Sequence, residues 1–224
     1  MRNVDRFRGR PCQGGLDLAS VADLTSWVLT FPCLEQPRAV DVVHLSFVPA
    51  PQVDPRRNPK RWRLYREWAD RGFLIVTDHE SVDYSIIRAR VLEDAARFDL
   101  RSVAVDRLFQ GQQLANELSS EGITVVPFGQ GFMSMGPAVA TFERRFLARE
   151  IHHGGDPVLR WAVSNAVTIT DGAGNRKIEK QKSADRVDPL VALVMALDRY
   201  ERQPPQVPVG SYYERHDLLV IGDD

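Results

Sequence analysis

The fold is decided by a short apolar run with one acid in it, Gly14-Gly15-Leu16-Asp17-Leu18-Ala19-Ser20. In two later stretches an aspartate closes or opens an apolar run: Ser102-Val103-Ala104-Val105-Asp106 and Arg186-Val187-Asp188-Pro189-Leu190-Val191-Ala192-Leu193. A carboxylate that ends a buried strand or begins a buried helix lies at the rim of the core. Three carboxylates at one rim would offer the oxygen ligands that Mg²⁺ and Mn²⁺ prefer.

The chain around Asp17 has the pattern of an antiparallel meander. Strands are predicted over 14–19, 26–31 and 39–48, joined by short links. Helices and strands then alternate, with helices over 62–71, 84–98, 108–118, 138–148 and 157–165 and strands over 73–77, 102–105 and 123–127. A two-stranded ribbon over 167–170 and 176–179 and an apolar helix over 188–200 follow. This order predicts an α/β fold with a mixed central sheet flanked by helices.

Composition limits the classes of function. The chain has 224 residues and a net charge of -1, so binding to nucleic acid must come from local basic patches rather than from a basic protein as a whole. Cys12 and Cys33 are too few for a disulfide framework or a zinc motif, and we expect both to be packing residues in a reducing compartment. No stretch has the length and apolarity of a signal peptide or a membrane span. We therefore expect a protein of the cell interior that does not bind membranes.

The three aspartates can be interpreted in two ways. Strand ends collect ligands at one edge of an α/β sheet, which would bring Asp17 and Asp106 together, and Asp188 begins the closing helix, where the helix dipole favours a negative charge. Asp23 and Asp185 are candidates for a fourth or outer metal ligand. Alternatively, the three are a turn residue, a strand-end cap and a helix cap, which are common uses of aspartate. Spacing alone leaves both interpretations open.

Several stretches resemble, in order, the nuclease domain of tailed-bacteriophage terminase large subunits. The resemblance begins at the opening run around Asp17 and its continuation to Thr25, and it extends to about Tyr200. The later matching stretches are Gly72-Phe73-Leu74-Ile75-Val76-Thr77, Val82-Asp83-Tyr84, Val105-Asp106-Arg107, Pro157-Val158-Leu159-Arg160-Trp161 with Asn165, and the run around Asp188. Each motif is weak by itself, but their order is fairly specific.

The resemblance implies an RNase H-like fold and a metal-dependent endonuclease that cuts concatemeric viral DNA during genome packaging. It implies Asp17, Asp106 and Asp188 as catalytic metal ligands for two Mg²⁺ or Mn²⁺ ions. The partners it implies are double-stranded DNA, the terminase ATPase domain, the small terminase subunit and the portal protein, in the host cytoplasm. On this interpretation, residues 1–13 are a lead-in, 14–202 the nuclease domain and 203–224 a proline-containing tail.

One feature of the full family protein is absent. The chain has no Gly-x-x-x-x-Gly-Lys-Ser/Thr phosphate loop, so we expect no ATP hydrolysis by this polypeptide itself. Two alternatives to the terminase hypothesis stay open. One is another RNase H-like nuclease, of the junction-resolvase or transposase type, and the other is a non-catalytic module that docks onto the packaging motor.

Basic residues near the third aspartate are candidates for DNA contact. A positive ribbon beside a metal site would guide a phosphate backbone into it; the residues are Lys182, Lys180, Arg176 and Lys177, with Arg107 beside Asp106. For Trp62, Tyr65 and Trp68 we favour packing over base stacking. The glycine-punctuated segment 129–136 is expected to be a loop, and the adjacent His152 and His153 point in different directions, which argues against joint metal binding.

Overall fold

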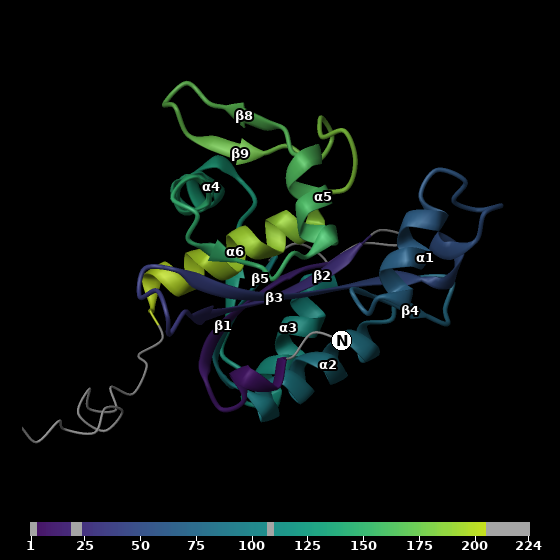
Figure 1. Ribbon diagram of the computed structural model, residues 1–224, viewed down its shortest axis with the longest axis horizontal. Helices are drawn as coiled ribbons and strands as arrows, with labels where there is room; N and C mark the ends of the chain where they lie inside the picture. Colours follow the sequence, from purple (N-terminus) through teal and green to yellow (C-terminus); the bar gives the residue numbers. More distant parts are fainter. Residues whose placement is uncertain (1–3, 19–23, 107–109, 205–224) are drawn as a thin grey trace, which may run out of the picture.

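A mixed β-sheet forms the centre of the computed structural model, which describes residues 4–18, 24–106 and 110–204 (Figure 1). The strand order is β4-β3-β2-β1-β5-β6, and β7 pairs with β3. The strands are β1 (Pro11–Asp17), β2 (Thr25–Pro32), β3 (Val40–Pro49), β4 (Leu74–Thr77), β5 (Asp99–Asp106), β6 (Val125–Phe128) and β7 (Ile151–His152).

Strand directions bring two of the three aspartates to one edge. β1, β2 and β3 form the predicted antiparallel meander. β5 is parallel to β1, with Leu16 opposite Val105, and β6 is parallel to β5. Because β1 and β5 are parallel neighbours, their last residues, Asp17 and Asp106, lie side by side at the same sheet edge.

Helices cover both faces of the sheet (Figure 1). α4 (Phe132–Leu147), α5 (Pro157–Asn165) and α6 (Asp188–Arg202) pack on one face, and α2 (Tyr84–Arg97) and α3 (Gln110–Ser120) on the other. α1 (Trp62–Asp70) packs against β4. Side chains of the strands alternate between the two cores, as the pleat requires, so Val28 faces α6 while Trp27 and Leu29 face α2 and α3.

Gly15 sets the separation between the sheet and α6. A Cβ at this position would lie 2.1 Å from the backbone oxygen of Ala192 and 2.6 Å from the backbone nitrogen of Ala196. Only a residue without a side chain therefore allows α6 to lie directly on β1. Asp17 is two residues further along the strand and points to the same face, the face that α6 covers.

Several elements differ from the sequence-based prediction. Residues 1–13, predicted as a lead-in, contain two elements in their described part: the 3-10 helix η1 (Val4–Phe7) and the start of β1 at Pro11. Phe7 is buried and stacks on Phe31, with ring centroids 4.4 Å apart, which is why this polar segment is ordered. The segment 129–136 is a loop only as far as Gly131, because Met135 and Gly136 belong to the buried side of α4.

Other expectations about the chain are borne out or extended. The ribbon is present as β8 (Thr168–Thr170) and β9 (Arg176–Ile178), and it lies over α4 (Figure 1). The short strand β7 and the 3-10 helix η2 (Ala50–Val53) were not predicted. Within the described ranges, no helix combines the length and apolarity needed to cross a membrane. Of the proposed tail, residues 205–224 lie outside the described residues.

Candidate metal centre

Asp17 and Asp106 end neighbouring parallel strands. Asp17 is buried, with 1% of its surface exposed, and Asp106 is half-buried. The alternation of side chains along β1 and β5 directs both carboxylates to the face covered by α6, because Gly15 and Ala104 face that helix. The sequence therefore places two oxygen donors at one edge through strand register alone.

Asp188 joins them from the first residue of α6. It lies one helical turn before Ala192, the residue whose backbone touches Gly15, so it is on the side of the helix that faces β1. The side chain of Lys180 connects the two acids. Its Nζ donates to Asp17 Oδ2 at 2.7 Å and to Asp188 Oδ1 at 3.0 Å. Asp17 and Asp188 thus share one ammonium group.

The pKa shifts of Asp17 and Lys180 show how burial and neighbouring charges act on this site. Burial raises the pKa of Asp17 to about 7; the charge of Lys180 opposes this shift, and the charges of Asp188 and Asp106 add to it. Burial lowers the pKa of Lys180, but its ion pairs with Asp17 and Asp188 outweigh this effect and raise the pKa above its ordinary value. The charges of Asp188 and Asp106 both act on Asp17, and Lys180 offers one positive charge to Asp17 and Asp188, an arrangement that a further cation would stabilise.

A second donor fixes the orientation of the Asp17 carboxylate. Gln130 Nε2 donates to Asp17 Oδ1 at 3.0 Å, so each oxygen of Asp17 has a partner. Gln130 lies between the end of β6 and the start of α4, in the segment that the sequence predicted to be a loop. Its contact with Asp17 was not predicted, because nothing in the local pattern indicates it.

The two candidates for an outer ligand have different outcomes. Asp23 lies outside the described residues. Asp185 forms ion pairs with Arg61 Nε at 2.5 Å and with Lys60 Nζ at 3.2 Å. Burial raises the pKa of Asp185, yet hydrogen bonds from Arg61, Arg186 and Lys60 lower it below its ordinary value overall. Asp185 and Asp188 line the same pocket of about 190 Å³.

Two of the basic residues proposed to contact DNA are engaged in ion pairs on the ribbon. Arg176 pairs with Glu143 of α4. Lys177 pairs with Glu179 at 3.2 Å and lies 5.4 Å from the centroid of the Phe132 ring. These contacts fasten the ribbon to α4 and reduce the charge that it presents.

Lys182 differs from these ribbon residues. It lies in the segment between β9 and α6, its side chain is exposed, and it forms no ion pair with any described residue. Arg107 falls outside the described ranges. Among the described members of the proposed set, Lys182 thus combines an exposed side chain with the absence of an ion pair.

The aromatic residues of α1 pack rather than stand exposed. Tyr65 and Trp68 are each 2% exposed, and both rings contact Trp161 of α5, with centroids 6.4 Å and 5.2 Å away. The packing interpretation is confirmed for Tyr65 and Trp68, whereas Trp62 is half-buried and lies against the guanidinium of Arg63. Tyr65 and Trp68 join α1 to α5 and thereby hold Lys60 and Arg61 beside Asp185.

Comparison with known proteins identifies the family of the chain. The sequence profile of the terminase large subunit endonuclease domain matches residues 1–203. The large terminase subunit of Enterobacteria phage HK97 is 37% identical over 190 residues, which are 84% of this chain and 37% of that protein. The chain belongs to the terminase large-subunit nuclease family.

Solved structures of this family share the fold. The crystal structure of the HK97 large terminase matches with a TM-score of 0.76 and 36% identity over 85% of this chain and 40% of that one. The nuclease of the large terminase from thermophilic phage G20c matches with a TM-score of 0.56 and 13% identity over 85% of this chain and 83% of that one, a likeness of fold alone. The predicted RNase H-like fold of the terminase nuclease domains is confirmed.

The relatives also differ from this chain in length. Protein YmfN of Escherichia coli strain K12 is 26% identical over 231 aligned positions, which cover 96% of this chain and 47% of that protein. The chain therefore spans less than half of the HK97 and YmfN proteins. The G20c nuclease has been solved with bound magnesium and with bound cobalt.

A buried polar network of the nuclease domain was not foreseen from the sequence. His44 Nδ1 lies 2.9 Å from Asp156 Oδ2, and His44 Nε2 lies 2.7 Å from Ser46 Oγ, which is 3.0 Å from Ser26 Oγ. Asp156 also caps α5 by accepting from two backbone amides. Ser26 lies opposite Asp17 in the pairing of β1 with β2, so this network begins next to Asp17 in the sheet. The signal in the sequence that could have predicted this network is a polar residue, His44, at a core-facing position of β3.

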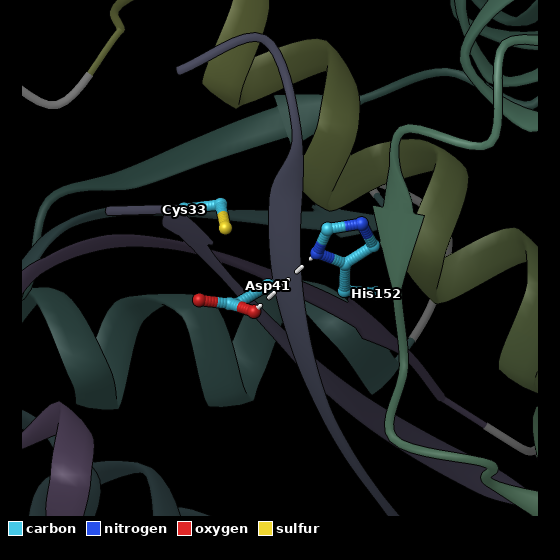
Figure 2. Close-up of side chains that lie close together, drawn as sticks. All are labelled: Cys33, Asp41 and His152. Atoms are coloured by element: carbon cyan, nitrogen blue, oxygen red, sulfur yellow. Dashed lines mark ion pairs between the residues drawn. The ribbon is translucent and has the colours of Figure 1, made fainter. Parts of the chain in front are cut away.

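A second cluster of potential ligands lies elsewhere on the sheet. Figure 2 shows Cys33, Asp41 and His152, whose ligand atoms lie within 4.8 Å of one another. The carboxylate of Asp41 is already within ion-pair distance of two guanidinium groups, those of Arg6 at 3.6 Å and Arg10 at 3.8 Å. A metal ion would have to compete with both guanidinium groups for Asp41. We therefore interpret this cluster as a group of ion pairs that stabilises the fold. Cys33 is 7% exposed, consistent with a packing role.

Proposed function

We propose that this chain is a metal-dependent DNA endonuclease that cuts concatemeric viral DNA during genome packaging. The observation that carries the proposal is the convergence of Asp17, Asp106 and Asp188 at one sheet edge, with Asp17 and Asp188 sharing Lys180. Membership of the terminase nuclease family supports the same activity. A site built from carboxylates needs neither a histidine base nor a serine nucleophile when cations supply the chemistry.

The donor set fits hard divalent cations. Asp17 and Asp188 are buried and Asp106 is half-buried, and carboxylate oxygens of this kind suit Mg²⁺ or Mn²⁺. The magnesium-bound structure of the G20c nuclease supports the assignment. Two such ions would activate water and stabilise the departing oxygen of a phosphodiester. Asp17, Asp106 and Asp188 would hold the ions; the charges of both other aspartates act on Asp17, and Gln130 orients its carboxylate.

The proposed substrate is double-stranded DNA, approached from the side of Lys182. The protein's overall charge is close to zero, so the backbone would be attracted locally by this exposed lysine and its neighbours. We further propose that the chain acts in the host cytoplasm with an ATPase domain, a small terminase subunit and a portal protein. Family membership supports these partners.

The test is plasmid nicking in Mn²⁺ by three single variants, Asp17→Asn, Asp106→Asn and Asp188→Asn. Each variant is expected to nick at least about a hundredfold more slowly, equivalent to about 2.7 kcal/mol of lost transition-state stabilisation. Asp99→Asn is the matched control, because Asp99 begins the same strand that Asp106 ends and pairs with Arg101. Parent-like nicking by Asp17→Asn and Asp188→Asn would refute the proposal.

The same assay separates the alternatives. A resolvase-type enzyme would cut branched DNA in preference to linear duplex. A docking module would bind packaging proteins without metal-dependent cutting, and Mn²⁺ would leave its thermal stability unchanged. Cutting of linear duplex together with stabilisation by Mn²⁺ is the result expected for a terminase nuclease.

A further inference from the structure

Lys180 occupies the space in which a cation shared by Asp17 and Asp188 would lie. Its Nζ is 2.7 Å from one carboxylate and 3.0 Å from the other, the distances of charge-assisted hydrogen bonds. A metal ion ligated by the same two oxygens would be at about 2.0–2.6 Å from each. One position cannot hold both cations, so the ammonium and the ion exclude each other there.

The backbone that carries Lys180 is fixed. The amide of Glu179 donates to Val167 O at 2.9 Å, and the amide of Ala184 donates to Asn165 O at 3.0 Å. Downstream, Asp185 is held by Arg61 and Lys60. The loop is thus anchored on both sides of Lys180. The Lys180 side chain can therefore leave the carboxylates without a movement of the loop backbone.

The side chain of Lys180 can reach solvent. About a third of it is exposed (36%), although its ammonium is paired, whereas the Asp17 side chain is 1% exposed. A lysine has four rotatable methylene links and a compact, strongly hydrated charge, so the ammonium can swing into solvent while Cα stays in place. The pocket of about 190 Å³ beside it gives this movement room.

We propose that Lys180 is a resident counter-ion of the metal-free centre, which a divalent cation displaces from Asp17 and Asp188 when it binds. The inference rests on the proposed metal centre. Lys180 keeps the two buried carboxylates together in the absence of metal and weakens metal binding, because an incoming ion must first break two charge-assisted hydrogen bonds. The released ammonium then lies at the mouth of the site, on the same loop as the exposed Lys182.

Chemical labelling of the parent chain tests this displacement without any substitution. Lysines are acetylated with a succinimidyl ester with and without Mn²⁺, and each site is quantified by peptide mass spectrometry. Lys180 is expected to be protected in the absence of Mn²⁺ and to become several-fold more reactive at saturating Mn²⁺, while Lys182 serves as the internal control and stays constant. Unchanged or reduced labelling of Lys180 on adding Mn²⁺ would overturn the inference.

Metal affinity provides the second measurement. Mn²⁺ binding at pH 8 is compared by calorimetry between the parent, Lys180→Met and the matched control Lys182→Met. Lys180→Met is expected to bind Mn²⁺ about tenfold more tightly or better, since each charge-assisted hydrogen bond that the ion need not break is worth roughly that factor. Lys182→Met should bind as the parent does.

The outcomes distinguish this inference from the function on which it rests. If the parent binds Mn²⁺ and cuts DNA but Lys180→Met binds no more tightly, the counter-ion role is wrong and the nuclease proposal stands. If neither protein binds Mn²⁺ and the parent does not cut, both are wrong. Lys180→Arg keeps the charge, so affinity close to that of the parent in this variant, measured on folded protein, supports displacement of a cation, and a tenfold gain in it contradicts that role.

Discussion

His44 is a fully buried polar residue whose two ring nitrogens both have partners. It connects Asp156, at the start of α5, with Ser46 and Ser26 in the meander. The side chains of His44 and Asp156 are both 0% exposed, so water cannot replace a lost partner. This network therefore joins α5 to β2 and β3, the two strands of the meander that follow the Asp17-bearing β1.

The substitution His44→Ala is expected to lower the free energy of unfolding by about 3 kcal/mol, because it removes a partner from a buried carboxylate and leaves a cavity. The measurement is the midpoint of urea unfolding. His79→Ala is the control, since the His79 side chain is 60% exposed and pairs with Asp83 at the surface, where we expect less than about 0.5 kcal/mol. Equal midpoints for the parent and His44→Ala would show that the network does not stabilise the fold.

Single residues also show where prediction from sequence reaches its limit. The position of Asp17 and Asp106 at the sheet edge could be predicted, because apolar runs indicate where strands end. The parallel register of β1 and β5 then brings the two residues side by side. Lys180 was assigned to DNA, yet it bonds Asp17 and Asp188, since a flexible side chain after a ribbon can turn either outward or inward. Likewise, the pairing of Asp185 with Arg61 depends on where α1 docks, and no local pattern encodes that.

At the level of elements, the contact between β1 and α6 controls the centre. Gly15 lets the helix lie on the strand, and the atoms that a Cβ would meet belong to the backbone of α6 and cannot rotate away. The elements themselves were largely predictable, because apolar periodicity identified the meander, the ribbon and α6. The start of α4 was not, since Gly131, Gly136 and Pro137 are residues that usually break a helix and only tertiary burial of Met135 overrides them.

The substitution Gly15→Ala is expected to destabilise the protein by about 1–3 kcal/mol, the usual cost of overpacking. It should also reduce nicking in Mn²⁺, because α6 carries Asp188 and must move away from Asp17. Gly172→Ala is the matched control, since a Cβ at Gly172 would meet nothing within 4 Å. Thermal unfolding and nicking of both variants are compared with those of the parent, and a stable, active Gly15→Ala protein would contradict this account.

At the level of the whole molecule, charge is balanced, so the proposed DNA contact depends on where single basic side chains are placed. The net charge is -1, and many basic side chains are used in ion pairs, including those of Arg176 and Lys177. Lys182 is exposed in the loop that leads to Asp188. We therefore expect a small number of phosphate contacts and a shallow dependence of affinity on salt.

For Lys182→Ala, the slope of log affinity against log salt concentration is expected to become shallower by about 1, the effect of losing one phosphate contact. Binding to linear duplex is measured in a chelator so that no cutting occurs, and several sequences should weaken equally. Arg101→Ala is the control, because Arg101 pairs with Asp99 at the opposite end of β5. An unchanged slope in Lys182→Ala would exclude this lysine from the DNA interface.

The parallel pairing of β1 with β5 has a consequence for how activity arises. Asp17, Asp106 and Asp188 come from the beginning, middle and end of the fold, so the centre exists only after distant segments have closed on one another. Such non-local pairings form late and slowly compared with single helices or the β1–β2 hairpin. A newly made or partly unfolded chain therefore holds its acids apart. On the proposed function, cutting of DNA would therefore require the assembled sheet and α6, and it would be lost when these segments separate.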